Sequence, residues 1–131
     1  MCGIVGYIGA KSAVDILLEG LTNLEYRGYD SAGVAVNIDG QVELYKAEGK
    51  LQNLKDIVAL KKAHIEKSTI GIGHIRWATH GLPTTTNAHP HTCNCKNFTL
   101  VHNGIIENYQ EIKTFLEEFR CKEHVKNVCY F

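Results

Sequence analysis

Cys2 lies one residue from the start of the chain, in the stretch MCGIVGYIG. A thiol acts as a nucleophile only where a nearby group can accept its proton. Internal cysteines usually depend on a histidine, but a cysteine exposed by removal of Met1 carries its own base, because an α-amino group has a pKa of about 7.7 to 8.0. The first residues therefore predict a nucleophile and a general base within one residue. The alternative is that Cys2 is a small buried hydrophobic residue.

Two further stretches hold polar groups that suit an acyl-transfer reaction. VHNG places the Asn103 side chain and the Gly104 backbone N–H at consecutive positions, and each donor of this kind can stabilise a developing oxyanion by about 3 kcal/mol. In HIRWATHG, Arg76 can bind a carboxylate with two parallel hydrogen bonds, and Trp77 can form a rigid apolar wall beside it. Taken alone, Asn-Gly also suits a turn and Arg76 also suits a structural ion pair.

The elements that must position these residues follow from the hydrophobic pattern. Ser12 is a helix cap with Asp15 three residues later, and Asp39-Gly40 between two alternating apolar runs is a strong hairpin signal. We expect strands over 3–9, 69–77 and 98–104, a hairpin over 31–46, and helices over 12–28, 51–64 and 108–119. The segment 81–95 contains both prolines of the chain and is expected to be a loop. This order indicates an α+β domain with an antiparallel sheet and helices packed on it.

Composition narrows the class of protein. The chain has 131 residues, which suits one domain, and its 14 Lys and Arg balance 14 Asp and Glu. Nothing in this balance indicates a nucleic-acid partner or an anionic membrane. Five cysteines are an odd number, and the chain has neither a signal-peptide pattern nor an apolar run long enough to span a bilayer. We therefore predict a cytoplasmic protein with free thiols.

Five motifs in one order resemble a known family. MCGIVG, LEYRGYDSAG, HIRWATHG, NAHPH and VHNGIIEN are similar to the N-terminal glutaminase domain of the glutamine–fructose-6-phosphate aminotransferases, which are class II glutamine amidotransferases. The resemblance covers residues 1–119, nearly the whole chain. It implies the N-terminal-nucleophile hydrolase fold, an αββα sandwich of helices and antiparallel sheets.

The resemblance also implies roles for the residues. Cys2 would attack the side-chain amide of glutamine and form a glutamyl thioester, with its own α-amine as base; ammonia leaves, and water then frees glutamate. Asn103 and the Gly104 N–H would form the oxyanion hole, and Arg27 would orient the nucleophile. The substrate would be held by Arg76 at its α-carboxylate, with the pocket shaped by Trp77, Thr79 and His80.

No cofactor is implied by this chemistry, and the partner is glutamine. In complete family members, which are oligomers, the ammonia passes to an isomerase domain that converts fructose 6-phosphate to glucosamine 6-phosphate, the first committed step toward UDP-N-acetylglucosamine. Fructose 6-phosphate would therefore be a partner only through that domain.

The sequence departs from the family after residue 119. Family members continue into a segment whose aspartate binds the α-ammonium of glutamine, whereas here the last aspartate is Asp56. Glu118 and Glu123 are poor substitutes for it. We interpret 120–131 as a divergent tail and the isomerase domain as absent, so that the sandwich is expected to be incomplete on its C-terminal side, with uncovered edges and apolar faces.

Two other functions stay open. The chain could be a non-catalytic fragment that at most binds glutamine or a partner weakly. Alternatively, four residues of the segment NAHPHTCNC could hold zinc, although structural zinc sites usually separate their ligand pairs by a longer loop; these residues are His89, His91, Cys93 and Cys95. His74 and His102 are interpreted as structural histidines, and the lysine-rich stretch KDIVALKKAHIEK as the solvated face of a helix.

Overall fold

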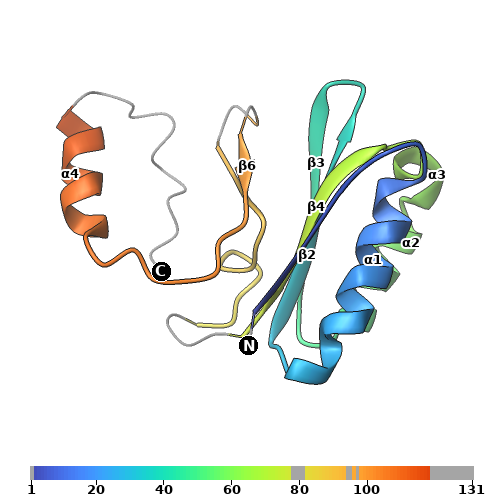
Figure 1. The fold of residues 1–131 in the computed structure, drawn as a ribbon, viewed down its shortest axis with the longest axis horizontal. Helices are drawn as coiled ribbons and strands as arrows, with labels where there is room; N and C mark the ends of the chain where they lie inside the picture. The colour runs from blue at the N-terminus through green and yellow to red at the C-terminus, as the bar shows by residue number, and fades with distance from the viewer. Residues whose placement is uncertain (1, 78–81, 94–95, 97, 119–131) are drawn as a thin grey trace.

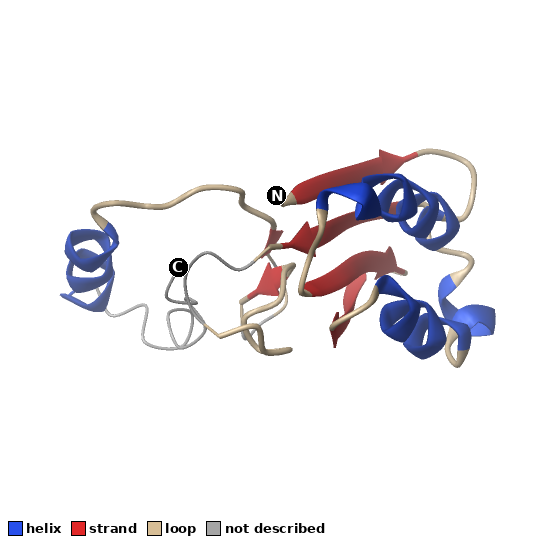
Figure 2. Ribbon diagram, turned by 90° about the horizontal axis from the view of Figure 1, so that it is seen from below, coloured by secondary structure: helices blue, strands red, loops and turns tan. Residues whose placement is uncertain are grey.

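The protein is built around a four-stranded antiparallel sheet with the strand order β1-β4-β2-β3 (Figure 1). The computed structural model describes residues 2–77, 82–93, 96 and 98–118. The sheet consists of β1 (Gly3–Ile8), β2 (Ser31–Ile38), β3 (Gln41–Glu48) and β4 (Ile70–Arg76). Its helices are α1 (Ala13–Leu24), α2 (Leu51–Ala59) and the short α3 (Lys62–Ile65), which all cover the same face of the sheet (Figures 1 and 2).

The core lies between this sheet and α1 and α2. Along β2, the side chains of Val34 and Val36 are completely buried, and so are Leu17 and Leu21 on α1. Strand alternation sends every second residue toward the helices, and the helical stripe repeats every three to four residues, so the two patterns meet in one apolar layer. The mixed helix and antiparallel-sheet class predicted from the sequence is therefore confirmed.

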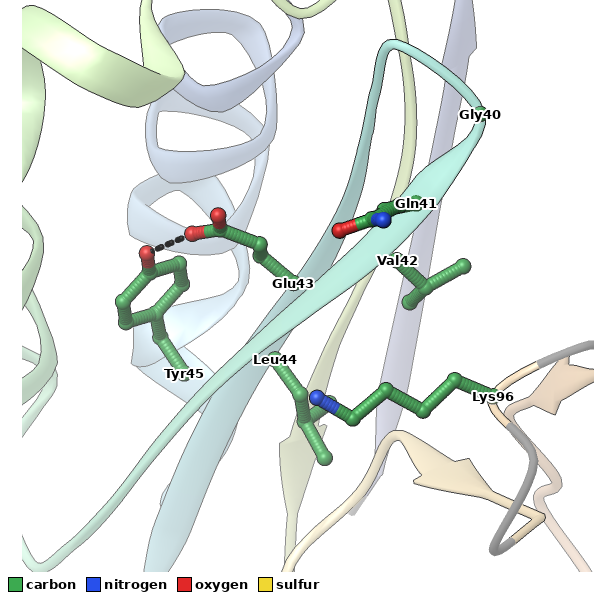
Figure 3. A pocket seen from close by; sticks show the side chains of 7 residues that line it. All are labelled: Gly40, Gln41, Val42, Glu43, Leu44, Tyr45 and Lys96. Atoms are coloured by element: carbon green, nitrogen blue, oxygen red, sulfur yellow. Dashed lines mark hydrogen bonds between the residues drawn. The ribbon is translucent and has the colours of Figure 1, made fainter.

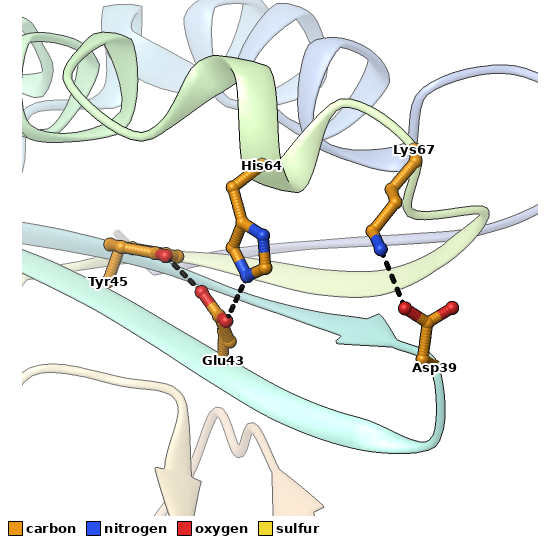
Figure 4. A network of polar contacts seen from close by, with 5 residues as sticks. All are labelled: Asp39, Glu43, Tyr45, His64 and Lys67. Carbon is orange, nitrogen blue, oxygen red and sulfur yellow. Dashed lines mark hydrogen bonds and ion pairs between the residues drawn. The ribbon is translucent and has the colours of Figure 1, made fainter.

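The β2–β3 hairpin forms where the sequence predicts it. Asp39 and Gly40 have φ values of 51° and 86°, which a tight two-residue turn of the hairpin type requires. This turn sets Ile38 opposite Gln41. The hairpin is tied to the segment around α3 by an ion pair between Lys67 Nζ and Asp39 Oδ2 at 2.6 Å (Figure 4).

A second tie lies further along β3. The carboxylate of Glu43 accepts hydrogen bonds from the Tyr45 hydroxyl and, at 2.7 Å, pairs with His64 Nε2 (Figure 4). The hydrogen bond from Tyr45 lowers the pKa of Glu43, and burial together with Glu43 raises the pKa of Tyr45 to about 12. These contacts explain why the histidine of the lysine-rich stretch turns toward the sheet, although its lysines stay solvated.

Helix α1 begins where its sequence signals predict, but it ends at Leu24, before the end expected at residue 28. The Ser12 side chain accepts a hydrogen bond from the Asp15 backbone N–H at 3.5 Å and caps the N-terminus. After Leu24 the chain continues as a 3₁₀ turn, η1 (Glu25–Arg27), which ends at Gly28 with φ 74°. The turn redirects the chain from the helix layer to the start of β2.

Several expectations need correction. The strand expected over 98–104 is limited to Thr99–Leu100. The segment 81–95 is not all loop, because β5 (His91–Thr92) pairs with β6 (Thr99–Leu100) in a second, two-stranded sheet. The helix expected over 51–64 is divided into α2 and α3 by a turn. Helix α4 (Tyr109–Glu118) stands apart from the first sheet (Figure 1), and the described apolar residues Ile112 and Phe115 of its predicted core stripe are exposed.

The segment before β5 packs against the face of the first sheet that α1 and α2 leave open. Lys46 Nζ donates hydrogen bonds to the Ala88 and Thr86 carbonyl oxygens at 2.6 and 3.3 Å. Opposite, the backbone of His89 approaches β2 so closely that a Cβ on Gly33 would lie 2.2 Å from the His89 carbonyl oxygen. The NAHPH motif is therefore held flat against β2, and only glycine fits at position 33.

We predict that Gly33→Ala destabilises the protein by about 1 to 3 kcal/mol, because either β2 or the 88–90 segment must move to accept the methyl group. The free energy of unfolding in urea measures this cost. Gly6→Ala is the matched control, since Gly6 also lies in a strand but has no atom within 4 Å of the added carbon. Equal effects of the two substitutions would contradict the packing argument.

Candidate functional site

The Cys2 thiol lies against the backbone of Trp77. Its Sγ accepts a hydrogen bond from the Trp77 N–H at 3.3 Å and donates to the Trp77 carbonyl oxygen at 3.5 Å. β1 pairs with β4 from Gly3 opposite Ile75, and this pairing brings the start of the chain to the residue that follows β4. The thiol is half-buried and not in a disulfide.

The YRGYDS stretch also contacts Trp77. A Cβ on Gly28 would lie 2.1 Å from the Trp77 ring, so the Gly28 backbone is in close contact with the indole. Gly28 also has the positive φ that glycine adopts without strain. The Asp30 N–H donates to the Arg76 carbonyl oxygen at 2.8 Å. Residues 28–30 and the end of β4 are thus joined at two points.

Tyr29 anchors this segment to the helix layer. Its hydroxyl donates to Glu25 Oε1 at 2.5 Å and accepts a hydrogen bond from the Leu51 backbone N–H at 2.6 Å. Burial, and after it the hydrogen bond to Glu25, raises the pKa of Tyr29. Arg27 is the last residue of η1 and directly precedes Gly28, so its backbone is held next to the Trp77 contact, although the Arg27 side chain lies outside the described residues.

Arg76 is the last residue of β4 and is only 8% exposed. Its Nη1 donates to the Leu82 carbonyl oxygen at 3.3 Å, which fixes the guanidinium beside the loop that follows β4. Trp77, the next residue, is 48% exposed. Its backbone contacts the Cys2 thiol. Thr79 and His80, which were expected to complete the pocket, lie outside the described residues.

Asn103 is connected to the site through His74, which the sequence analysis interprets as a structural histidine. Its Oδ1 lies 2.8 Å from Nε2 of His74, a β4 residue that is 1% exposed. Gly104 follows with φ 142°. The Asn103–Gly104 pair therefore sits at the same sheet end as Cys2. The contact was not predicted, and the only available signal was that His74 precedes Arg76 by two residues and so shares its face of the strand.

The rings of three buried histidines, His74, His89 and His91, contact one another in a row. The ring centroids of His74 and His89 are 4.4 Å apart, and those of His89 and His91 are 4.3 Å apart. Burial, and after it the charges of neighbouring groups, lowers the pKa of His89 to about 3 and that of His91 to about 4. Burial is also the main cause of the lowered pKa of His74. All three rings are therefore neutral at neutral pH.

The metal alternative gains no support from this cluster. Among the residues that the structure describes, no group of three His, Cys, Asp or Glu side chains is arranged to hold a metal ion. Cys93 instead accepts a hydrogen bond from the Phe98 N–H at 3.3 Å, in the turn between β5 and β6. The fourth residue of the expected set, Cys95, lies outside the described part of the chain.

A hollow lies away from these residues, on the β2–β3 hairpin. It has a volume of about 610 Å³ and follows the outer edge of the sheet, where it is lined by Gly40–Tyr45 of the hairpin and by Lys96 (Figure 3). None of the predicted site residues lines it, and its one carboxylate, Glu43, is already engaged by Tyr45 and His64. Among the described residues, no cysteine, serine or threonine lines it. The residues able to do acyl chemistry are gathered around Trp77 instead.

Comparisons with known proteins identify the fold and the relatives of the chain. No family model matches the chain. Two solved structures share the fold: one described as the allosteric regulatory enzyme of purine biosynthesis (TM-score 0.74, 27% identity, 92% of this chain and 26% of that one) and a glutamine phosphoribosylpyrophosphate amidotransferase from B. subtilis (TM-score 0.72, 26% identity, 92% and 25%). Over 92% of its length the chain therefore has the fold of these two enzymes, the N-terminal-nucleophile amidotransferase fold.

The sequence relatives of the chain share one name. The chain is 51% identical over 130 residues to a glutamine–fructose-6-phosphate aminotransferase (isomerizing) of Bacillus thuringiensis, covering 99% of this chain and 20% of that protein. The proteins of the same name in Caldanaerobacter subterraneus and Synechocystis are 58% and 56% identical over 118 residues, which is 90% of this chain and 19% and 18% of theirs. The chain therefore corresponds to the amino-terminal part of glutamine–fructose-6-phosphate aminotransferases. It spans about a fifth of the length of these relatives.

The buried histidines predict how stability depends on pH. A histidine whose folded pKa lies below its unfolded value of about 6.5 stabilises the folded state above that value, and this contribution is lost as pH falls toward the folded pKa. For His89 and His91, with folded pKa values of about 3 and 4, the loss between pH 7.5 and pH 5 is about 2 kcal/mol each.

Urea unfolding at the two pH values measures this loss. In His91→Phe the difference between pH 7.5 and pH 5 should be smaller by the share of one histidine. An unfolding free energy that stays constant over this range would show that these rings are protonated in the folded state.

Proposed function

We propose that this chain carries the glutamine-hydrolysing site of an amidotransferase, with Cys2 as the nucleophile. The observation that supports it most is the position of the Cys2 thiol against the Trp77 backbone, where the YRGYDS, HIRW and MCG motifs meet. No internal base contacts the sulfur among the described residues. Removal of Met1 supplies the α-amine of Cys2 as that base.

The proposed reaction has two stages. The α-amine takes the thiol proton, and the thiolate attacks the side-chain carboxamide carbon of glutamine, whose oxygen becomes an oxyanion held by the Asn103 amide and the Gly104 N–H. The carbon–nitrogen bond then breaks, and the leaving nitrogen takes the proton from the α-ammonium to depart as ammonia. Water, deprotonated by the same amine, cleaves the thioester and yields glutamate and a free thiol.

The remaining residues bind and orient the substrate in this proposal. Arg76 receives the α-carboxylate of glutamine in a site sheltered from water, which strengthens a bidentate pair. Trp77, Thr79 and His80 shape the pocket, and Arg27 orients the nucleophile, since the adjacent Gly28 contacts the Trp77 ring.

We further propose that residues 1–119 are the amino-terminal part of the glutaminase domain and that 120–131 are a divergent segment that follows it. The ammonia would serve the conversion of fructose 6-phosphate to glucosamine 6-phosphate, because the relatives are named for an aminotransferase reaction between glutamine and that sugar phosphate. No helix of the described residues is long and apolar enough to cross a membrane. A cytoplasmic location is part of the proposal.

Cys2→Ala should reduce glutamate release from glutamine by roughly 10³-fold or more, since the only proposed nucleophile is removed. An enzymatic assay of glutamate measures this loss. Cys93→Ala is the matched control, because Cys93 is also a half-buried free thiol but lies in the β5–β6 turn. An active Cys2→Ala variant, or an active protein whose intact mass includes Met1, would refute the mechanism.

Arg76→Lys should raise the KM for glutamine about 10-fold while kcat changes little, because lysine keeps the charge and loses the planar pair of donors. Steady-state kinetics separate the two constants. 4-Aminobutanamide, which lacks the α-carboxylate, is the control substrate: wild type and variant should handle it equally. A variant that discriminates against both substrates to the same degree would show that Arg76 does not bind the carboxylate.

A further inference from the structure

His74 makes one polar contact that bears on the proposed reaction. Its side chain projects from β4, is 1% exposed, and places Nε2 at 2.8 Å from Asn103 Oδ1. The other nitrogen, Nδ1, is buried and has no hydrogen-bond partner among the described residues. The contact to Asn103 is therefore the polar interaction that determines how this ring is used.

The direction of this hydrogen bond follows from the chemistry of the two groups. An amide oxygen only accepts, so Nε2 of His74 must carry a proton. Burial and the nearby positive charge of Arg76 lower the pKa of His74, which leaves the ring neutral with its single proton on Nε2. A proton on Nδ1 would instead leave a buried donor unsatisfied and two acceptors facing each other.

The state of the His74 ring fixes the orientation of the Asn103 amide. With Oδ1 occupied on the sheet side, the NH₂ group points to the other side, and Asn103 is exposed there. An oxyanion needs N–H donors and is repelled by an amide oxygen. An asparagine without a fixed partner can rotate its amide by half a turn at little cost, which would put the oxygen where the donor is needed.

The strand register places His74, and through it the bound Asn103 amide, near the nucleophile. Ile4 on β1 lies opposite His74 on β4, and residues directly opposite in an antiparallel pair have Cβ atoms about 5 Å apart. Cys2 is two residues before Ile4, and its Sγ contacts Trp77, three residues after His74. The His74 ring, which binds the Asn103 amide, and the Cys2 thiol thus lie near the same end of these two strands.

We propose that His74 is a positioning residue for catalysis: its Nε2–H holds Asn103 Oδ1 so that the Asn103 NH₂ group faces the oxyanion formed at Cys2. This inference rests on the proposed function, because it assigns His74 a part in stabilising the same tetrahedral intermediate. It differs from a packing role, which the stack of His74 on His89 at 4.4 Å would fulfil with either nitrogen protonated.

The first test is the protonation state of His74 in the folded wild-type chain. Nitrogen-15 NMR of labelled histidine distinguishes the two neutral forms, and the signals of the seven histidines are assigned by their loss in single variants. We expect neutral His74 with the proton on Nε2. A proton on Nδ1 would overturn the proposal, since Nε2 would then accept from the Asn103 amide nitrogen and turn the oxygen outward.

The second test uses substitutions with different donors. His74→Gln keeps an N–H close to the position of Nε2, whereas His74→Leu keeps volume and removes the donor. We expect His74→Leu to lower kcat for glutamine about 10- to 100-fold with less than about a 3-fold change in KM, below the 10²- to 10³-fold effect of losing an oxyanion donor. His74→Gln should recover most of the rate. His91→Leu, in the same stack but one ring further from Asn103, controls for disruption of the cluster.

A double-substitution cycle separates positioning from a direct effect. If His74 acts through Asn103, His74→Leu should cost nothing further in an Asn103→Ala background. Equal losses in His74→Leu, His74→Gln and His91→Leu, or full additivity with Asn103→Ala, would overturn the proposal. Failure of the proposed function has a different signature: no glutamate release that depends on Cys2. The NMR measurement needs no turnover and still decides the state of His74 in that case, as it does if His74→Leu does not fold.

Discussion

The antiparallel pairing of β4 with both of its neighbours is the constraint on which the candidate site depends. β4 is an inner strand, so β1 on one side and β2 on the other fix it along its whole length. The end of β4 and the residue after it then support the site. The Trp77 backbone contacts the Cys2 thiol, the Arg76 carbonyl oxygen accepts a hydrogen bond from the Asp30 N–H, and His74 binds Asn103. A slip of one residue in this register would turn His74 and Arg76 to the opposite face of the sheet.

Close backbone approach is the second requirement of the arrangement. At Gly28 the chain passes against the Trp77 ring, and at Gly33 the His89 carbonyl reaches β2. Both contacts join segments that are far apart in the sequence, and both leave no room for a side chain. The site is therefore supported by packing of backbone on backbone and ring on backbone, which is more rigid than contacts between long side chains.

Local signals predicted the elements well, and long-range contacts limited the rest. The Ser12 cap and the Asp39-Gly40 turn act within four residues, so their patterns are readable in the sequence and the structure confirms them. β5 was missed because a two-residue strand has no measurable alternation and exists only through pairing with β6. The apolar stripe of α4 correctly predicted a helix, but its burial depends on what lies beside it, and Ile112 and Phe115 are exposed in the described structure.

The candidate site shows the same division between local and long-range information. Cys2, Arg76 and Asn103 could be selected because their chemistry is visible in the residue type and its neighbours. His74 could not be distinguished from a structural histidine, because its part depends on a hydrogen bond to a residue 29 positions away. The sequence also contains no sign that the His89 ring lies against His74 and the His91 ring against His89. Such assignments require the register of β4.

The neutral histidine stack bears on which group can act as the base. Transfer of a proton from a thiol of ordinary pKa, about 8.5, to a ring with the pKa of His89, about 3, would cost about 7 kcal/mol before any bond forms. Transfer to an α-amine of pKa about 7.7 to 8.0 costs about 1 kcal/mol or less. Burial thus makes these rings poor bases and leaves them good neutral donors. The proposed mechanism therefore assigns proton transfer to the α-amine of Cys2, and it leaves to His74 the orientation of the Asn103 amide.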